Sequence, residues 1–323
     1  MRAVILLATL CGAAGAAEAP YQYFIEGNPA DVQTRTSAGL LLAGGGQDQD
    51  AAFRWLIRQS GGGDIVVVRA SGAGAYNRYI YDLGKVDSVE TLVVKTPAAA
   101  RDPFVVERIR RAEALFIAGG DQWNYMRVWK GTPMVDAMQS LVDRGVPVGG
   151  TSAGLAVLPQ FVFTAEKDTV TSAQALADPY DERVTVGTEL VRIPLLRGIV
   201  TDTHFAARDR MGRTLVFLAR MLVDGQAAPA RAIAADERTA ALVEADGSVA
   251  VEGEGSVYFL RAAGKPEICR RGAPLTMRGI EVYRVRRGGA FGLRDWSGRG
   301  GTAYRLDVEA GAVRSTGAGG SPY

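Results

Sequence analysis

The stretch VPVGGTSAGLAVL at residues 146–158 decides the fold class and carries the first chemical clue. It starts with a short apolar run, passes through Gly150-Thr151-Ser152-Ala153-Gly154, and ends in a run that favours the start of a helix. A serine in a Gly-x-Ser-x-Gly turn between a strand and a helix occupies the setting of a nucleophile elbow. Because glycine tolerates unusual backbone conformations, the turn can present the hydroxyl. A tight turn in which Ser152 only caps the helix is the alternative.

Apolar runs elsewhere in the first two thirds of the chain alternate with amphipathic segments. Runs that favour buried strands lie at residues 40–43, 65–68, 91–94, 114–118, 146–148 and 198–200. Residues 48–59 and 134–143 have the apolar spacing of helices. Strands that alternate with helices predict an α/β fold, a three-layer sandwich whose parallel sheet is covered on both faces.

We predict three regions along the chain. Residues 1–19 have a basic start, an apolar run and a small-residue tail, which is typical of a secretory signal and predicts a secreted or periplasmic protein. A buried N-terminal segment is the alternative. Residues 20–225 form the α/β catalytic core. In residues 226–323, short alternating runs separated by turn signals predict completion of the core followed by a β-rich C-terminal region.

Composition limits the partners. The 37 basic and 35 acidic residues give a net charge of +2, so we expect no nucleic-acid partner. After the signal no apolar run reaches the roughly 18 residues of a membrane span, so we expect none. With one histidine and, in the mature chain, one cysteine, we expect no metal and no cofactor. That lone Cys269 would allow an intermolecular bridge, so a homodimer stays open.

His204 is the only histidine, and imidazole is the usual base that activates a serine near neutral pH. If Ser152 is a nucleophile with a histidine base, no other residue can be that base. The amides of Ala153 and Gly120 are candidate donors to the oxyanion. The residue types leave four candidates for the acid that orients the imidazole, and spacing cannot choose among Glu166, Asp168, Asp202 and Glu237.

Polar residues follow two other strands. Gly119-Gly120-Asp121-Gln122 ends one of them, where Gln122 could orient a substrate, although Asp121 could equally cap a helix. Three arginines follow His204, at positions 208, 210 and 213. On a helix Arg210 and Arg213 would share a face, with Arg208 elsewhere. Together they favour a substrate that bears carboxylates, and a salt-bridged helix start is the alternative.

Together these segments resemble the cyanophycinases. The resemblance rests on Phe116 to Gln122, on Gly149 to Gly154, on Asp202-Thr203-His204-Phe205 with the three arginines, and on Asp236 to Ala240. The wider family includes aspartyl dipeptidases, whose fold is similar to that of class I glutamine amidotransferases. The resemblance implies a serine exopeptidase that acts on β-linked aspartyl-arginine polymer or on related aspartyl dipeptides.

The resemblance also implies roles for residues. Ser152 would be the nucleophile, His204 the base and Glu237 the acid, which we favour over the dipeptidase-like positions Glu166 and Asp168. The implied substrate-binding residues are Gln122, Asp202, Thr203, Arg208, Arg210 and Arg213. Thr203 stands where we expect glutamine in cyanophycinases, and residues 172–186 look longer than the matching stretch, so polymer and dipeptide both stay open. The β-rich end looks like an addition in a secreted branch.

Two other functions compete with this interpretation. An α/β-hydrolase esterase shares the elbow but orders its triad as serine, acid, histidine, which would require Glu166 or Asp168. Its histidine usually lies near the end of the chain, whereas more than a third of this chain follows His204. The other rival is a noncatalytic protein that binds aspartyl peptides.

Overall fold

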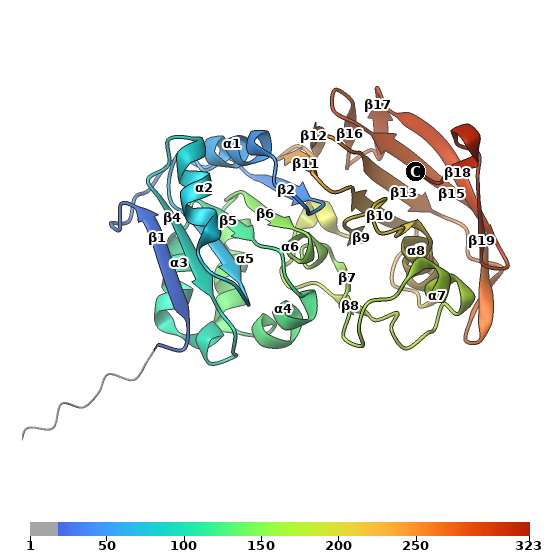
Figure 1. The fold of residues 1–323 in the computed structure, drawn as a ribbon, viewed down its shortest axis with the longest axis horizontal. Helices are drawn as coiled ribbons and strands as arrows, with labels where there is room; N and C mark the ends of the chain where they lie inside the picture. The colour runs from blue at the N-terminus through green and yellow to red at the C-terminus, as the bar shows by residue number, and fades with distance from the viewer. Residues whose placement is uncertain (1–18) are drawn as a thin grey trace, which may run out of the picture.

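The computed structural model describes residues 19–323, which form two β-sheets with helices packed against them (Figure 1). The predicted signal peptide lies outside the described residues, apart from its last position. Among residues 19–323 no helix has the length and apolar character needed to cross a membrane.

The first sheet has ten strands, and its centre is parallel. Their order is β1 (Gln22–Gly27), β4 (Ser88–Val93), β3 (Ile65–Arg69), β5 (Ala114–Ile117), β6 (Val148–Thr151), β2 (Gly39–Ala43), β11 (Thr239–Glu244), β12 (Ser248–Gly253), β16 (Ala290–Gly292) and β17 (Ser297–Arg299). The five strands from β4 to β2 are parallel, while β1 and the strands from β11 onward pair antiparallel. The continuous apolar runs therefore lie where both faces of the sheet are buried.

Helices cover both faces of this parallel part. On one face, Phe53 and Ile80 pack against the sheet from α1 and α2. On the other, Trp129 and Met138 pack from α4 and α5, next to α3. The bounds are α1 (Asp50–Gln59), α2 (Ala75–Leu83), α3 (Pro103–Arg111), α4 (Gln122–Trp129) and α5 (Pro133–Asp143). The predicted three-layer α/β class is confirmed.

A second sheet, which the sequence did not predict as a separate unit, carries part of the site. Its order is β19 (Ala312–Ser315), β18 (Thr302–Glu309), β15 (Ala273–Val285), β13 (Val257–Ala262), β10 (Ala230–Ala235), β9 (Ile199–Asp202), β7 (Phe161–Phe163) and β8 (Val186–Thr188), and β14 (Ile268–Arg270) pairs with β15. Strands β7, β9 and β10 are parallel. Helix α8 (Met211–Val223) packs its apolar side chains on one face of this sheet, next to α7 (Ser172–Ala177).

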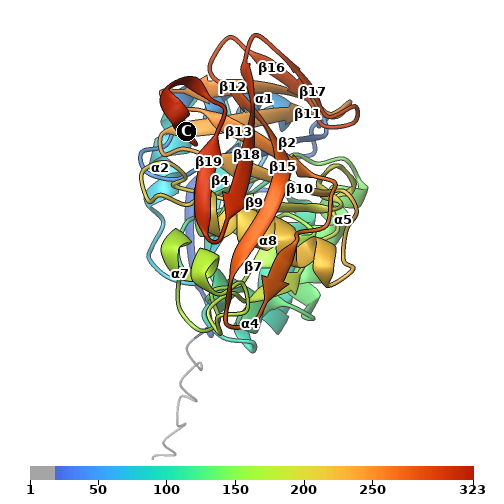
Figure 2. The same cartoon turned by 90° about the vertical axis from the view of Figure 1, so that its right-hand side faces the viewer.

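The C-terminal residues are β-rich as expected, and their strands are part of the two sheets instead of forming a separate tail. Strands β11, β12, β16 and β17 extend the first sheet, and β10, β13, β15, β18 and β19 extend the second, where β15, β18 and β19 lie side by side (Figure 2). Phe259 and Phe291, one from each sheet, stack with ring centres 3.8 Å apart. The two sheets therefore share a core, and the end of the chain joins them.

Candidate active site

Ser152 occupies the turn between β6 and α6 (Ala153–Ala156) with φ 53° and ψ −119°, a conformation that non-glycine residues rarely adopt. A Cβ on Gly150 would lie 2.5 Å from the carbonyl carbon of Gly154, and a Cβ on Gly154 would lie 2.7 Å from that of Ile117. Both glycines are therefore needed for the close approach of the turn. The Ser152 side chain makes no helix-capping hydrogen bond. The turn is a strained elbow, and the capping interpretation is wrong.

The hydroxyl of Ser152 meets the sole imidazole of the chain. Ser152 Oγ lies 2.8 Å from His204 Nε2, and His204 Nδ1 lies 2.6 Å from Glu237 Oε1. When Nδ1 donates its proton to the carboxylate, Nε2 is free to accept the serine proton. The expected contact between residues 152 and 204 is confirmed.

Among the four candidate acids, the geometry selects Glu237. Glu166 is exposed and Asp168 accepts from the neighbouring amide of Thr169. Asp202 is bound by an arginine, as described below. The order along the chain is serine, histidine, acid, which differs from the order of an α/β-hydrolase.

The three side chains come from different parts of the two sheets. Ser152 follows β6 of the first sheet, whereas His204 follows β9 of the second and has φ 48°. Glu237 lies in the turn from β10 to β11, where the chain passes from the second sheet to the first. The site therefore lies where the sheets meet, and its geometry depends on how they pack.

Sequence reasoning missed the residues that hold this junction together, Gly44 to Gly46, which follow β2. His204 donates its amide proton to the carbonyl of Gly44 at 2.7 Å, and the amide of Arg238 donates to the carbonyl of Gly45 at 2.8 Å. A Cβ on Gly45, whose φ is 95°, would lie 2.5 Å from His204 Nε2. Three glycines after a buried strand were the available signal, but the sequence does not show that the histidine loop packs on them.

The electrostatics keep the imidazole neutral. Burial lowers the pKa of His204 below its usual value, the hydrogen bond to Glu237 opposes this, and the nearby charges of Arg208 and Arg210 add to the lowering. The hydrogen bond from His204 lowers the pKa of Glu237 in turn. At neutral pH the arrangement therefore contains a neutral base next to a carboxylate, as proton abstraction from serine requires.

The loop after β5 packs beside Ser152. A Cβ on Gly119 would lie 3.5 Å from the Cβ of Ser152, so this loop packs against the elbow. The amide of Ser152 is already bonded to the carbonyl of Ala43. In the described part of the chain the amides of Gly120 and Ala153 have no backbone acceptor, so they are available as the expected oxyanion donors.

Two of the expected substrate-binding residues are engaged with each other. Arg213 donates from Nε to Asp202 Oδ2 at 2.8 Å and from its terminal nitrogen to Oδ1 at 2.5 Å, and both side chains are 3% exposed. Burial opposes ionisation of Asp202, but the charge of Arg213 outweighs it and leaves the pKa lowered. Asp202 and Arg213 therefore bind each other inside the fold, and the expected contact of these two residues with substrate stays a prediction.

The other expected substrate-binding residues differ in their availability. Arg210 precedes α8 instead of sharing a helical face with Arg213, and it donates to the carbonyl of Thr203 at 2.9 Å. Burial lowers the pKa of Arg210 to about 10. Thr203 is buried, and the half-buried Gln122 donates to the carbonyl of Phe163 at 3.4 Å. Arg208 is the exposed arginine of the three.

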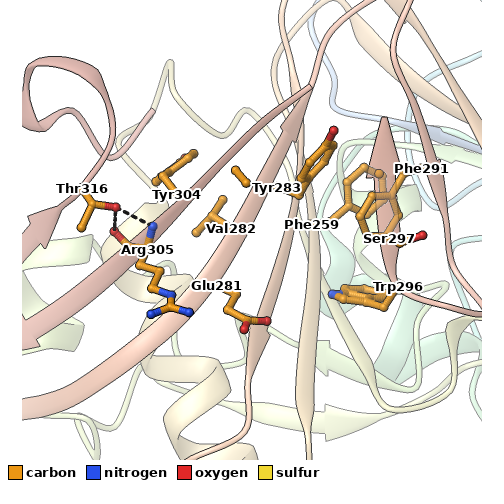
Figure 3. A pocket seen from close by; sticks show the side chains of 12 residues that line it. Phe259, Glu281, Val282, Tyr283, Phe291, Trp296, Ser297, Tyr304, Arg305 and Thr316 are labelled. Atoms are coloured by element: carbon orange, nitrogen blue, oxygen red, sulfur yellow. Dashed lines mark hydrogen bonds between the residues drawn. The ribbon is translucent and has the colours of Figure 1, made fainter. Parts of the chain in front are cut away.

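A cavity of about 430 Å³ lies on the C-terminal strands, apart from these residues. Its aromatic wall includes Phe259, Tyr283, Phe291 and Trp296 (Figure 3). No residue of the triad lines it. The reactive groups therefore do not use this hollow.

Comparisons with known proteins agree with the geometry. Residues 40–178 match the model of peptidase family S51, a match that contains Ser152. A cyanophycinase of Synechococcus elongatus is 29% identical over 263 residues, which cover 75% of this chain and 76% of that protein. A cyanophycinase of Nostoc sp. is 26% identical over 276 residues, which cover 80% and 86%. The chain is a serine peptidase, and it is similar to peptidase family S51 and to the cyanophycinases.

The fold of a solved peptidase structure also matches. The crystal structure of a peptidase from an acI-B1 Actinobacterium superposes with a TM-score of 0.55 at 17% identity, and the match covers 79% of this chain and 97% of that one. At this identity the likeness concerns the fold alone. The family match ends before His204 and Glu237, so the positions of these two residues in this peptidase rest on the geometry above.

Proposed function

We propose that this serine peptidase hydrolyses β-linked aspartyl-arginine polymer, or related aspartyl dipeptides, through an acyl-enzyme. The observation that carries the proposal is the continuous chain of contacts from Ser152 through His204 to Glu237. The cyanophycinases among its relatives support the substrate class.

The proposed chemistry follows from the contacts. His204 Nε2 takes the proton of Ser152 Oγ, and the oxygen attacks the scissile carbonyl. The amides of Gly120 and Ala153 bind the oxyanion of the tetrahedral intermediate. As the intermediate collapses, His204 gives its proton to the leaving amine, and a water molecule activated by the same imidazole then hydrolyses the ester.

Arg208 is the residue that we propose to bind a substrate carboxylate. It is exposed, and its charge is close enough to His204 to lower the pKa of the imidazole. A guanidinium binds a carboxylate through two parallel hydrogen bonds. Arg210 holds the Thr203 loop and would act indirectly, through the position of the neighbouring His204.

The test is mass spectrometry of the products after parallel incubation with cyanophycin, β-Asp-Arg and α-Asp-Arg. We expect free arginine and aspartate from the β-linked dipeptide, or β-Asp-Arg from the polymer, and little from the α-linked peptide. The Ser152→Ala variant should release none of these products. Cleavage of the α-linked peptide alone, or unchanged release by Ser152→Ala, would refute the proposal.

We also propose export of the protein, on the strength of the pattern in residues 1–19. N-terminal sequencing of the protein recovered from the source cells should begin near residue 20, and a start at Met1 would refute export. A homodimer stays a prediction that sedimentation would test.

A further inference from the structure

Tyr125, on α4, packs against the loop after β5, which carries the amide of Gly120, one of the two candidate oxyanion donors. Its side chain is 1% exposed, and its hydroxyl lies 2.9 Å from the carbonyl oxygen of Ala118 and 3.0 Å from that of Gly119. The single hydroxyl proton is therefore shared between two adjacent carbonyls of this loop.

The carbonyl of Gly119 belongs to the same peptide group as the amide of Gly120. The carbonyl of Gly119 and the amide of Gly120 form one planar peptide group, in which C=O and N–H point in opposite directions. A donor that binds the Gly119 oxygen therefore also fixes the direction of the Gly120 N–H. Gly119, in the same loop, packs against Ser152. Such a donor also polarises the peptide group, which makes the N–H a stronger donor.

The phenol itself is held rigidly. Its ring stacks on Trp129 with ring centres 4.3 Å apart, and the indole Nε1 of Trp129 donates to the carbonyl of Val94 at 3.0 Å. Burial raises the pKa of Tyr125, so the hydroxyl keeps its proton and remains a donor throughout the working range of pH. The contact with the loop is tight, because a Cβ on Gly120 would lie 2.7 Å from the hydroxyl oxygen.

We propose that Tyr125 is a positioning residue for catalysis, which holds and polarises the Gly119–Gly120 peptide so that the Gly120 amide can bind the oxyanion. This inference rests on the proposed acyl-enzyme chemistry but not on the identity of the substrate. A donor that acts on the oxyanion stabilises the transition state more than the bound substrate, so its loss lowers kcat and leaves KM almost unchanged.

The test compares Tyr125→Phe with Tyr304→Phe. Tyr304 is also a buried tyrosine that donates to a backbone carbonyl, that of Pro322 at 2.8 Å, but it lies on β18. We expect Tyr125→Phe to lower kcat about tenfold, a fraction of the roughly 10²–10³-fold loss when an oxyanion donor is removed entirely. KM should change less than twofold, and Tyr304→Phe should leave both constants unchanged. An unchanged kcat, or a raised KM with kcat retained, would overturn the inference.

A second pair of variants tests the contact even if the phenylalanine variant is less stable. Gly120→Ala should lower kcat, because the new methyl group meets the hydroxyl of Tyr125. The double variant of Gly120→Ala and Tyr125→Phe should have the same kcat as Tyr125→Phe alone, because the hydroxyl oxygen that the new methyl group would meet is absent. Additive losses would contradict the inference.

A fluorophosphonate that reacts with Ser152 separates this inference from the proposed substrate. If the wild-type protein reacts with the probe and Tyr125→Phe reacts about tenfold more slowly, Tyr125 acts on the oxyanion whichever peptide is cleaved. Equal rates of labelling would overturn the role of Tyr125, whereas failure to cleave aspartyl peptides by a protein that is labelled would overturn only the substrate.

Discussion

Replacement of Gly45 by alanine would place a methyl group against the ring of His204. The new Cβ would lie 2.5 Å from Nε2 and 3.1 Å from Nδ1. Carbon and nitrogen atoms that are not bonded prefer separations of about 3.5 Å, so the ring or the Gly44–Gly46 loop must move by about 1 Å. A displacement of about 1 Å in a catalytic group costs roughly 10²-fold in rate. We therefore expect Gly45→Ala to lower kcat by about 100-fold.

The control for this variant is Gly131→Ala. Gly131 has φ 72°, and a Cβ there would meet nothing within 4 Å, so this variant pays the backbone cost of a left-handed alanine without a steric clash. That cost is about 1–2 kcal/mol of stability. Thermal melts should show a loss of stability in both variants, and initial rates on β-Asp-Arg should fall only in Gly45→Ala. A wild-type kcat in Gly45→Ala, or an equal fall of kcat in both variants, would show that the contact with Gly45 does not position His204.

Three other variants test separate parts of the site. Glu237→Gln removes the charge that stabilises the imidazolium and should lower kcat by about 10²–10⁴-fold. Glu166→Gln is the control and should retain the wild-type rate. Equal kcat values for the two variants would exclude Glu237 as the acid. Arg208→Gln removes a positive charge that lowers the pKa of His204, so the acidic limb of the pH profile of kcat/KM should move to higher pH. The limb should stay in place in Arg110→Gln, which changes an exposed arginine of α3. An unmoved limb in Arg208→Gln would show that the charge of Arg208 does not lower the pKa of His204. Arg213→Met leaves the buried carboxylate of Asp202 without its partner and should lower the free energy of unfolding, measured in urea, by about 3–5 kcal/mol. A raised KM with unchanged stability would instead indicate that Arg213 binds the substrate.

The sequence predicts most of the first sheet because its strands are continuous apolar runs separated by helices of regular period. It also predicts the elbow, because glycine is the only residue type that fits at positions 150 and 154. Ser152 and His204 could be paired by elimination, because the chain offers one imidazole.

What the sequence does not reveal depends on packing between segments far apart in the chain. It cannot show that β9 belongs to a second sheet, so the support of His204 by Gly45 is invisible until the sheets are placed together. Arg213 is expected at the substrate because it is one of three arginines that closely follow His204. The aspartate eleven residues earlier binds it inside the fold. Tyr125 looks like an ordinary core aromatic, and only its contact with Gly119 suggests a catalytic task.

The proposed mechanism requires that Ser152 becomes acylated during turnover. Intact-protein mass spectrometry of enzyme quenched in acid during hydrolysis of the preferred aspartyl peptide measures this directly. We expect an added mass equal to the acyl half of the substrate, located on the peptide that contains Ser152 and absent from Ser152→Ala. Steady product release with no adduct on the wild-type protein, together with activity of Ser152→Ala, would show that Ser152 is not acylated.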